Sequence, residues 1–115
     1  MLRSQLHELG YLSVQEADTG PAALEQLRAG AFEVLITDWW MPGMSGIELL
    51  RQVRADQALG GLRVIVVTAE NRPEQEAEAM RAGADAFVLK PFASSILQST
   101  LEAVLGARRV RQAGT

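Results

Sequence analysis

The sequence contains no cysteine, one histidine and one lysine, and only 5% of its 115 residues are aromatic. Without cysteine the chain cannot form disulfides, a thiolate metal site or a cysteine nucleophile, and it suits a reducing compartment. No apolar run approaches the ~20 residues that a membrane span needs, and the N-terminus lacks a basic and then apolar export signal. We therefore expect a cytoplasmic protein with no membrane association.

Positive charge is scarce over most of the chain. Residues 1–105 carry eight basic against 14 acidic side chains, a net charge of −6, because Arg108, Arg109 and Arg111 lie beyond them. Such an acidic surface repels phosphate backbones, so duplex nucleic acid is not an expected partner. Hydrophobic residues, in contrast, make up an ordinary 48%, which is enough for one packed domain.

Helical and strand-like hydrophobic patterns alternate along the chain. They predict helices over residues 1–10, 20–30, 45–59, 73–83 and 93–105, and strands over 11–17, 32–38, 62–68 and 86–89. Ser45 and Glu48 match a capping box at one helix start, and the run LRVIVVT at 62–68 is typical of a strand buried on both faces. The alternation predicts an α/β fold over 1–105, an open, doubly wound parallel sheet with helices on both faces. A polar, arginine-containing tail over 106–115 follows.

Three polar residues lie where predicted strands end. Asp38 and Thr68 are the last residues of two strands, and Lys90, the single lysine, directly follows the last strand. Because ligands bind beyond the carboxyl ends of parallel strands, we expect the three to share one crevice. Each alone would be ordinary, as a turn aspartate, a strand threonine or a Lys-Pro turn. Their occurrence at three successive strand ends favours a site.

The residue types at these ends indicate phosphoryl transfer. An aspartate carboxylate can attack phosphorus to form an aspartyl phosphate, so Asp38 is the candidate acceptor. The Lys90 ammonium and the Thr68 hydroxyl suit the charged oxygens of the transferred group, and Mg²⁺ normally assists. Asp38 is the one carboxylate at the strand ends, with Glu70 as a more distant candidate ligand.

Three sequence runs, ITDWWMPGMSGIELL, VIVVTAE and GADAFVLKPF, carry a family pattern. In their order and spacing they resemble the receiver domains of two-component response regulators, most of all the single-domain CheY-type regulators. The resemblance extends over residues 1 to about 105. It implies a flavodoxin-like (CheY-like) fold with the strand order 2-1-3-4-5.

The resemblance also implies roles for single residues and for partners. By position, Asp38 matches the phosphoacceptor, Trp40 contributes a backbone carbonyl that ligates Mg²⁺ together with Asp38, Thr68 matches the switch hydroxyl, Lys90 the phosphate-binding lysine before a cis proline, and Phe87 the switch aromatic. The implied phosphoryl donor is a histidine kinase or a phosphotransfer domain. The implied output is a downstream protein bound by the last two helices and the last strand, residues 73–105.

One feature of the family pattern is missing. Receiver domains begin with a central strand that ends in an acidic pair of magnesium ligands, and nothing before Leu2 can form that strand. A start codon placed too late, or a truncation, is favoured over a chain that borrows a strand or has lost the chemistry. We expect weak Mg²⁺ binding and an incomplete sheet that a second molecule can repair by dimerisation.

Two other functions compete with phosphorylation-controlled signalling. The missing acidic pair favours a phosphorylation-independent interaction domain. A phosphatase of the haloacid dehalogenase type also uses Asp, Thr and Lys at successive strand ends, but it needs a second aspartate where this chain has Trp40. We therefore expect a signalling module and not an enzyme. A stand-alone regulator and a piece of a hybrid kinase both remain open.

Overall fold

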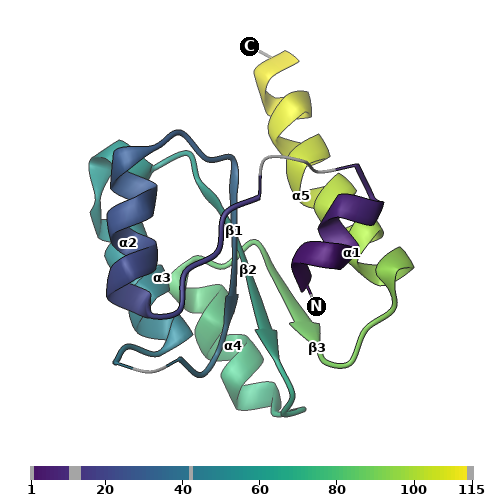
Figure 1. The fold of residues 1–115 in the computed structure, drawn as a ribbon, viewed down its shortest axis with the longest axis horizontal. Helices are drawn as coiled ribbons and strands as arrows, with labels where there is room; N and C mark the ends of the chain where they lie inside the picture. Colours follow the sequence, from purple (N-terminus) through teal and green to yellow (C-terminus); the bar gives the residue numbers. More distant parts are fainter. Residues whose placement is uncertain (1, 11–13, 42, 114–115) are drawn as a thin grey trace.

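The computed structural model describes residues 2–10, 14–41 and 43–113, which form a sheet between two helical layers (Figure 1). In chain order the elements are α1 (Leu2–Glu8), α2 (Gly20–Ala29), β1 (Val34–Asp38), α3 (Gly46–Ala55), a 3₁₀ turn η1 (Gln57–Leu59), β2 (Arg63–Thr68), α4 (Pro73–Ala82), β3 (Ala86–Leu89) and α5 (Ser94–Ala113). Among the described residues, no helix is both long and apolar enough to cross a membrane.

The sheet is parallel and runs in the order β1-β2-β3. In its register, Asp38 lies opposite Val67 and Thr68 lies opposite Leu89. Each pair of neighbouring strands is joined through a helix, as parallel strands require. The predicted fold class, a parallel α/β sheet of the CheY type, is confirmed, and the three strands agree with a missing central strand.

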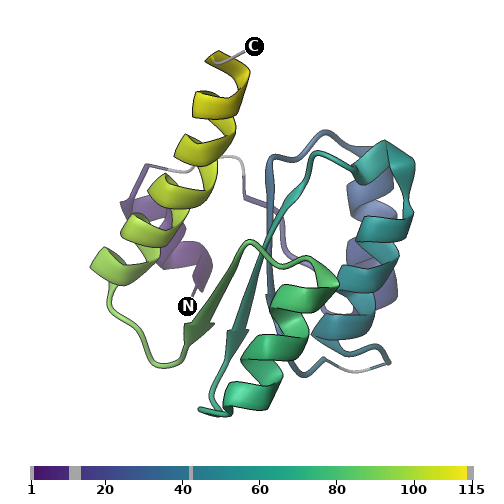
Figure 2. The same cartoon turned by 180° about the vertical axis from the view of Figure 1, so that it is seen from behind.

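Each face of the sheet has its own hydrophobic core. Helices α2, α3 and α4 cover one face, and α1 and α5 cover the other (Figures 1 and 2). On the first face Leu49, Leu50, Val53, Val64 and Val66 are fully buried. On the second face the fully or almost fully buried side chains are Ile65, Val67, Leu97 and Leu101. Strand β2 is apolar on both faces because both faces are covered.

Local signals position the helices. The Ser45 hydroxyl accepts a hydrogen bond from the Glu48 N–H (3.2 Å) and donates one to the Glu48 carboxylate, so the predicted cap at the start of α3 is confirmed. Thr19 caps α2 in the same way, through the Ala22 N–H. Gly83 ends α4 with a φ of +110°, a left-handed conformation that favours glycine.

The predicted strand over 11–17 is not confirmed. Residues 11–13 lie outside the described residues, and 14–17 are extended without joining the sheet. The Glu16 carbonyl accepts its hydrogen bond from the Gln26 side chain (3.0 Å) and not from a neighbouring strand. A strand needs a partner for its ladder, and the described residues place none beside 14–17.

Two predicted helix ends are wrong. The helix predicted over 45–59 ends at Ala55, because the Asp56 carboxylate accepts the Ala58 N–H (2.9 Å) and turns the chain into η1. The helix predicted over 93–105 continues in α5 to Ala113. Gly106 is the single helix-weakening residue there, and the alanines, arginines and glutamine after it favour a helix.

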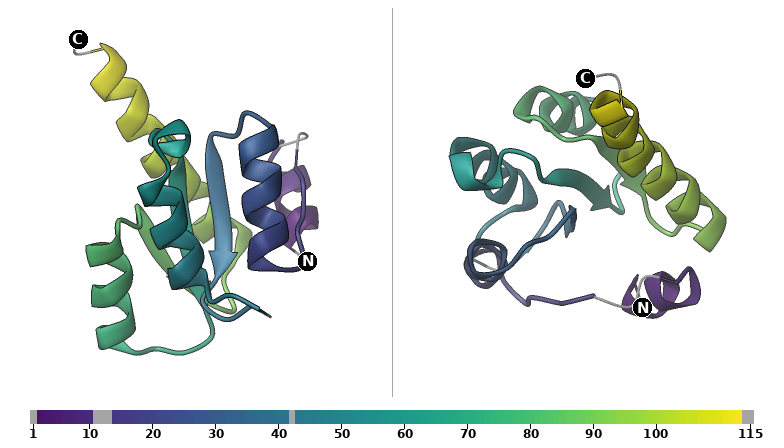
Figure 3. Two further views of the ribbon diagram at one scale, coloured as in Figure 1. Left: turned by 90° about the vertical axis from the view of Figure 1, so that its left-hand side faces the viewer. Right: turned by 90° about the horizontal axis from the view of Figure 1, so that it is seen from above.

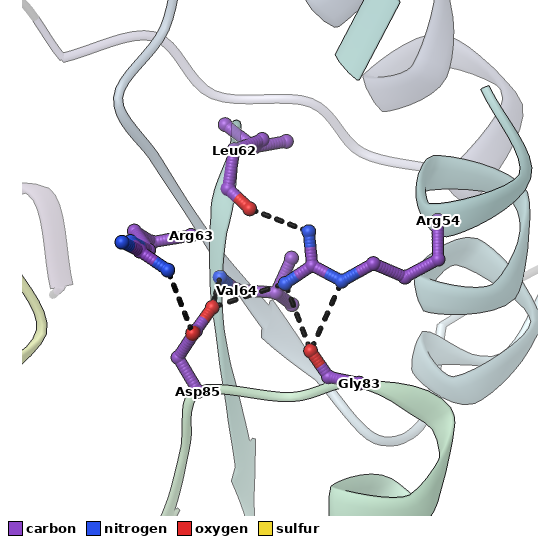
Figure 4. Close-up of polar contacts among 6 residues, drawn as sticks. All are labelled: Arg54, Leu62, Arg63, Val64, Gly83 and Asp85. Carbon is purple, nitrogen blue, oxygen red and sulfur yellow. Dashed lines mark hydrogen bonds and ion pairs between the residues drawn. The ribbon is translucent and has the colours of Figure 1, made fainter. Parts of the chain in front are cut away.

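A polar network fixes the edge of the sheet where β2 and β3 begin (Figure 4). The Asp85 carboxylate accepts hydrogen bonds from the Val64 N–H (2.8 Å), from Arg54 (3.0 Å) and from Arg63 (3.4 Å). Arg54 also donates to the backbone carbonyls of Leu62 and Gly83. One α3 side chain thereby links the starts of β2 and β3, at the edge opposite the candidate site.

Candidate functional site

The three predicted strand-end residues lie at one edge of the sheet. Asp38 ends β1 and Thr68 ends β2, while Lys90 follows β3, so the strand order brings them together. The Lys90 Nζ forms an ion pair with Asp38 Oδ1. The Asp38 and Lys90 side chains remain 45% and 43% exposed. A carboxylate that faces an ammonium and is also open to solvent can meet an incoming phosphoryl donor.

Thr68 is held in place by its backbone and is almost completely buried. Its carbonyl accepts a hydrogen bond from the Lys90 N–H (2.7 Å), which ties the two strand ends together. Its hydroxyl accepts a hydrogen bond from the Glu70 N–H (3.2 Å). The hydroxyl oxygen therefore accepts from the loop after β2, and its O–H could donate to a phosphoryl group on Asp38.

The residues around Asp38 depend on a close approach of α3. The Gly46 N–H donates to the Trp39 carbonyl (2.7 Å), and a Cβ at position 46 would lie 2.0 Å from the Asp38 carbonyl oxygen. Only glycine leaves room for this contact. The one local signal of this close approach in the sequence is the place of Gly46 directly after the capping Ser45.

The two tryptophans that follow Asp38 have different surroundings. Trp39 packs edge-on against Phe87, with ring centroids 6.5 Å apart and an interplanar angle of 77°. Trp40 points into solvent and is 80% exposed. The contact of Trp39 with Phe87, the predicted switch aromatic, joins residues 48 positions apart. Only the fold brings them together.

The donor set for a magnesium ion is small. No group of three or more His, Cys, Asp and Glu side chains that could hold a metal exists within the described ranges. Asp38 is already paired with Lys90, and the Glu70 carboxylate pairs with Arg72 (2.7 Å) instead of reaching the site. Mg²⁺ usually keeps several waters and takes one or two carboxylates. These residues alone do not fit a strong magnesium site.

The peptide bond between Lys90 and Pro91 is cis, as the family resemblance implied. The family of the response regulator receiver domain matches residues 1–102. The chain belongs to this family. Receiver domains act in two-component signalling, where they exchange phosphoryl groups with histidine kinases and generally bind Mg²⁺ at their acidic site.

Individual relatives agree with the family assignment. The chain is 45% identical over 104 residues to the chemotaxis protein CheY of Pseudomonas aeruginosa, an alignment that covers 90% of this chain and 84% of that protein. It is 42% identical to chemotaxis protein CheY-3 of Vibrio cholerae over 104 residues, with 90% and 80% covered. The receiver domain is thus similar to single-domain CheY proteins.

Solved structures share the fold. Chemotaxis protein CheY4 of Vibrio cholerae superposes with a TM-score of 0.83 at 33% identity, covering 90% of this chain and 86% of the other. A CheY-like receiver domain protein of Methanospirillum hungatei gives a TM-score of 0.85 at 27% identity, with 95% and 85% covered. The receiver fold is therefore retained although the described residues form three strands.

Proposed function

We propose that this receiver domain accepts a phosphoryl group on Asp38 from a histidine kinase or a phosphotransfer domain and changes a protein-binding surface in response. The observation that carries the proposal is the ion pair between Asp38 and Lys90 at the open carboxyl edge of the sheet. A carboxylate nucleophile and a positive charge beside it are two of the groups that phosphoryl transfer uses. Residues 1–105 would form this domain, with 106–115 as an appended segment.

The proposed reaction uses the groups at the strand ends. A carboxylate oxygen of Asp38 attacks phosphorus, the bond from phosphorus to the donor imidazole nitrogen breaks, and the electron pair remains with the imidazole. Lys90 then transfers its contact from the carboxylate to a phosphoryl oxygen, because the phosphoryl group carries more negative charge. Mg²⁺, when bound, would supply further neutralisation at the same oxygens.

The proposed response begins at Thr68. Its hydroxyl leaves the Glu70 N–H and donates to the phosphoryl group, which moves the loop after β2. Phe87 lies one strand away and packs on Trp39, next to the phosphorylated residue. The movement of this loop and a rotation of Phe87, the proposed switch aromatic, would both reach the surface built from α4, β3 and α5, residues 73–105. There Met80, Leu89 and Ile96 are exposed and can serve a downstream protein.

One observation favours a second function. Because the described residues contain no cluster of metal ligands, a phosphorylation-independent interaction domain is the alternative. A phosphatase of the haloacid dehalogenase type finds less support, since the exposed Trp40 occupies the position of its second aspartate. Receiver domains are signalling proteins and not classical enzymes.

Labelling with radioactive acetyl phosphate tests the proposal. Because we expect weak Mg²⁺ binding, labelling is measured at a high Mg²⁺ concentration, where the native chain should incorporate acid-stable, hydroxylamine-sensitive label, and less after chelation with EDTA. Asp38→Asn should incorporate none, whereas Asp18→Asn, a matched change at an acidic residue outside the site, should label like the native chain. Equal labelling of Asp38→Asn would disprove Asp38 as acceptor, and a complete lack of labelling in a folded chain would favour the phosphorylation-independent alternative.

A further inference from the structure

Among the described residues, two polar side chains are buried, Thr37 and Thr68. Thr68 belongs to the candidate site, whereas Thr37 directly precedes the proposed acceptor, Asp38. Thr37 is 3% exposed and lies opposite Val66, a fully buried residue of the core that α2, α3 and α4 cover. A valine at position 37 would match the branched shape of threonine and would avoid the burial of a hydroxyl. Packing alone therefore does not explain a hydroxyl at this position.

The Thr37 hydroxyl has two acceptors, at the end of β1 and in the loop after it. Its oxygen lies 3.1 Å from the Asp38 carbonyl oxygen and 3.5 Å from the Met41 sulfur. A hydroxyl has one proton to donate, and a thioether sulfur is a weak acceptor. We therefore assign the stronger hydrogen bond to the Asp38 carbonyl, which belongs to the residue that carries the proposed nucleophile.

The Asp38 carbonyl lies outside the ladder between β1 and β2. The Trp39 N–H donates to the Val67 carbonyl (2.8 Å), and in a trans peptide the N–H and the preceding carbonyl point in opposite directions, so the Asp38 carbonyl points away from β2. Helix α3 begins beside the end of β1 (Figure 3), but the Gly46 N–H donates to the Trp39 carbonyl (2.7 Å). Within the described ranges, the Thr37 hydroxyl is therefore the donor to the Asp38 carbonyl.

The peptide group between Asp38 and Trp39 is thereby held on both sides. Val67 binds its N–H and Thr37 binds its carbonyl, and because a peptide group is planar, the two bonds together restrict the backbone dihedrals beside it. The Asp38 side chain extends from this backbone into a position where it is 45% exposed. Phosphoryl transfer depends on the alignment of the attacking and leaving atoms, and a small misplacement lowers its rate strongly. The backbone therefore has to supply part of that alignment.

We propose that Thr37 is a positioning residue for the phosphorylation of Asp38: its hydroxyl holds the Asp38 carbonyl and thereby sets the direction from which the carboxylate meets the phosphoryl donor. The inference rests on the proposed phosphoryl transfer to Asp38. Thr37 acts through the backbone and not by contact with the phosphoryl group. A hydroxyl that only stabilised the fold would change stability, whereas a positioning hydroxyl also changes the rate of phosphorylation in the folded chain.

Two substitutions separate the hydroxyl of Thr37 from its methyl group. Thr37→Val retains the shape and removes the hydroxyl, whereas Thr37→Ser, the matched control, retains the hydroxyl and removes the methyl group. With acetyl phosphate at a high Mg²⁺ concentration, the initial labelling rate should fall about fivefold or more in Thr37→Val and stay within about twofold of native in Thr37→Ser. The NMR chemical shift of the Asp38 carbonyl carbon, which reports its hydrogen bond, should change more in Thr37→Val than in Thr37→Ser. Circular dichroism shows that each variant is folded.

A native labelling rate in Thr37→Val, or in Thr37→Ala as a second variant without the hydroxyl, would overturn the inference. Labelling of Thr37→Ser as slow as that of Thr37→Val would also overturn it, because the effect would then follow the methyl group and its packing. The failure of the proposed function has a different signature. A native chain that takes no label would contradict both proposals, whereas equal labelling of the native chain and Thr37→Val would contradict the positioning role alone.

Discussion

At the scale of single residues, Lys90 is the most informative side chain of the site. The Lys90 side chain is 43% exposed, and its ammonium pairs with Asp38. It is the one lysine in the sequence, whereas the other ten basic residues are arginines. An arginine would retain the charge but would present a planar fork of donors in place of a point charge. Charge and shape at this position can therefore be separated by substitution.

Replacement of Lys90 should slow phosphorylation without unfolding the domain. For Lys90→Gln we expect the rate of phosphoryl incorporation from acetyl phosphate to fall about tenfold or more, because a charge that stabilises the transferring group is lost. Lys90→Arg should be intermediate. Initial rates of labelling, with circular dichroism as the folding control, provide the measurement. Native rates in Lys90→Gln would contradict the role given to the ammonium.

Asp56 introduces a pH dependence of stability outside the site. The Arg28 side chain donates to its carboxylate (3.0 Å) and the Ala58 N–H donates a second bond, and together they lower the pKa of Asp56 below its ordinary value. A lowered pKa in the folded state stabilises the fold above the unfolded-state pKa, about 3.9, and this contribution is lost as the pH falls through the folded-state pKa. Asp56→Asn should therefore flatten the decrease in unfolding free energy below about pH 4, measured by urea titration, and an unchanged pH profile would contradict the assignment.

At the scale of helices and strands, the network around Asp85 fixes the relation of α3 to β2 and β3. Asp85→Ala would leave the Val64 N–H without its partner and remove two ionic contacts, of which the pair with Arg54 measures 3.0 Å. We expect a loss of about 1–3 kcal/mol in unfolding free energy, since a partly buried donor becomes unsatisfied. Glu102→Ala, on the exposed side of α5, is the control and should change stability by less than about 0.5 kcal/mol. Equal effects of the two substitutions would show that the network is not stabilising.

Elements whose signals are local could be predicted from the sequence. The apolar run of β2 and the Ser45 cap of α3 were predicted because both depend on residues that are close together in the sequence. A strand over 11–17 was predicted and not confirmed, because a strand exists only if another strand lies beside it. The contact of Trp39 with Phe87 could not be predicted either, since it joins the residue after β1 to a residue within β3, 48 positions away.

At the scale of the whole molecule, strand β3 connects the candidate phosphorylation site to the proposed protein-binding surface of residues 73–105. Asp38, Thr68 and Lys90 occupy the carboxyl edge of the sheet, and β3 connects that edge to α4 and α5 on its two faces. We expect a change in charge at Asp38 to move the carboxyl end of β3 and the loop after it, while the Arg54 network holds the loop before β3 at the opposite edge. The account therefore predicts a response that is confined to one side of the domain.

Hydrogen exchange on the native chain and on Asp38→Asn, each with and without acetyl phosphate and Mg²⁺, tests this central claim most directly. The account predicts that phosphorylation changes amide exchange within residues 73–105 of the native chain, leaves the start of β2 near Val64 unchanged, and has no effect on Asp38→Asn. A fully labelled native chain whose 73–105 segment exchanges as before, or the same change in Asp38→Asn, would contradict the account.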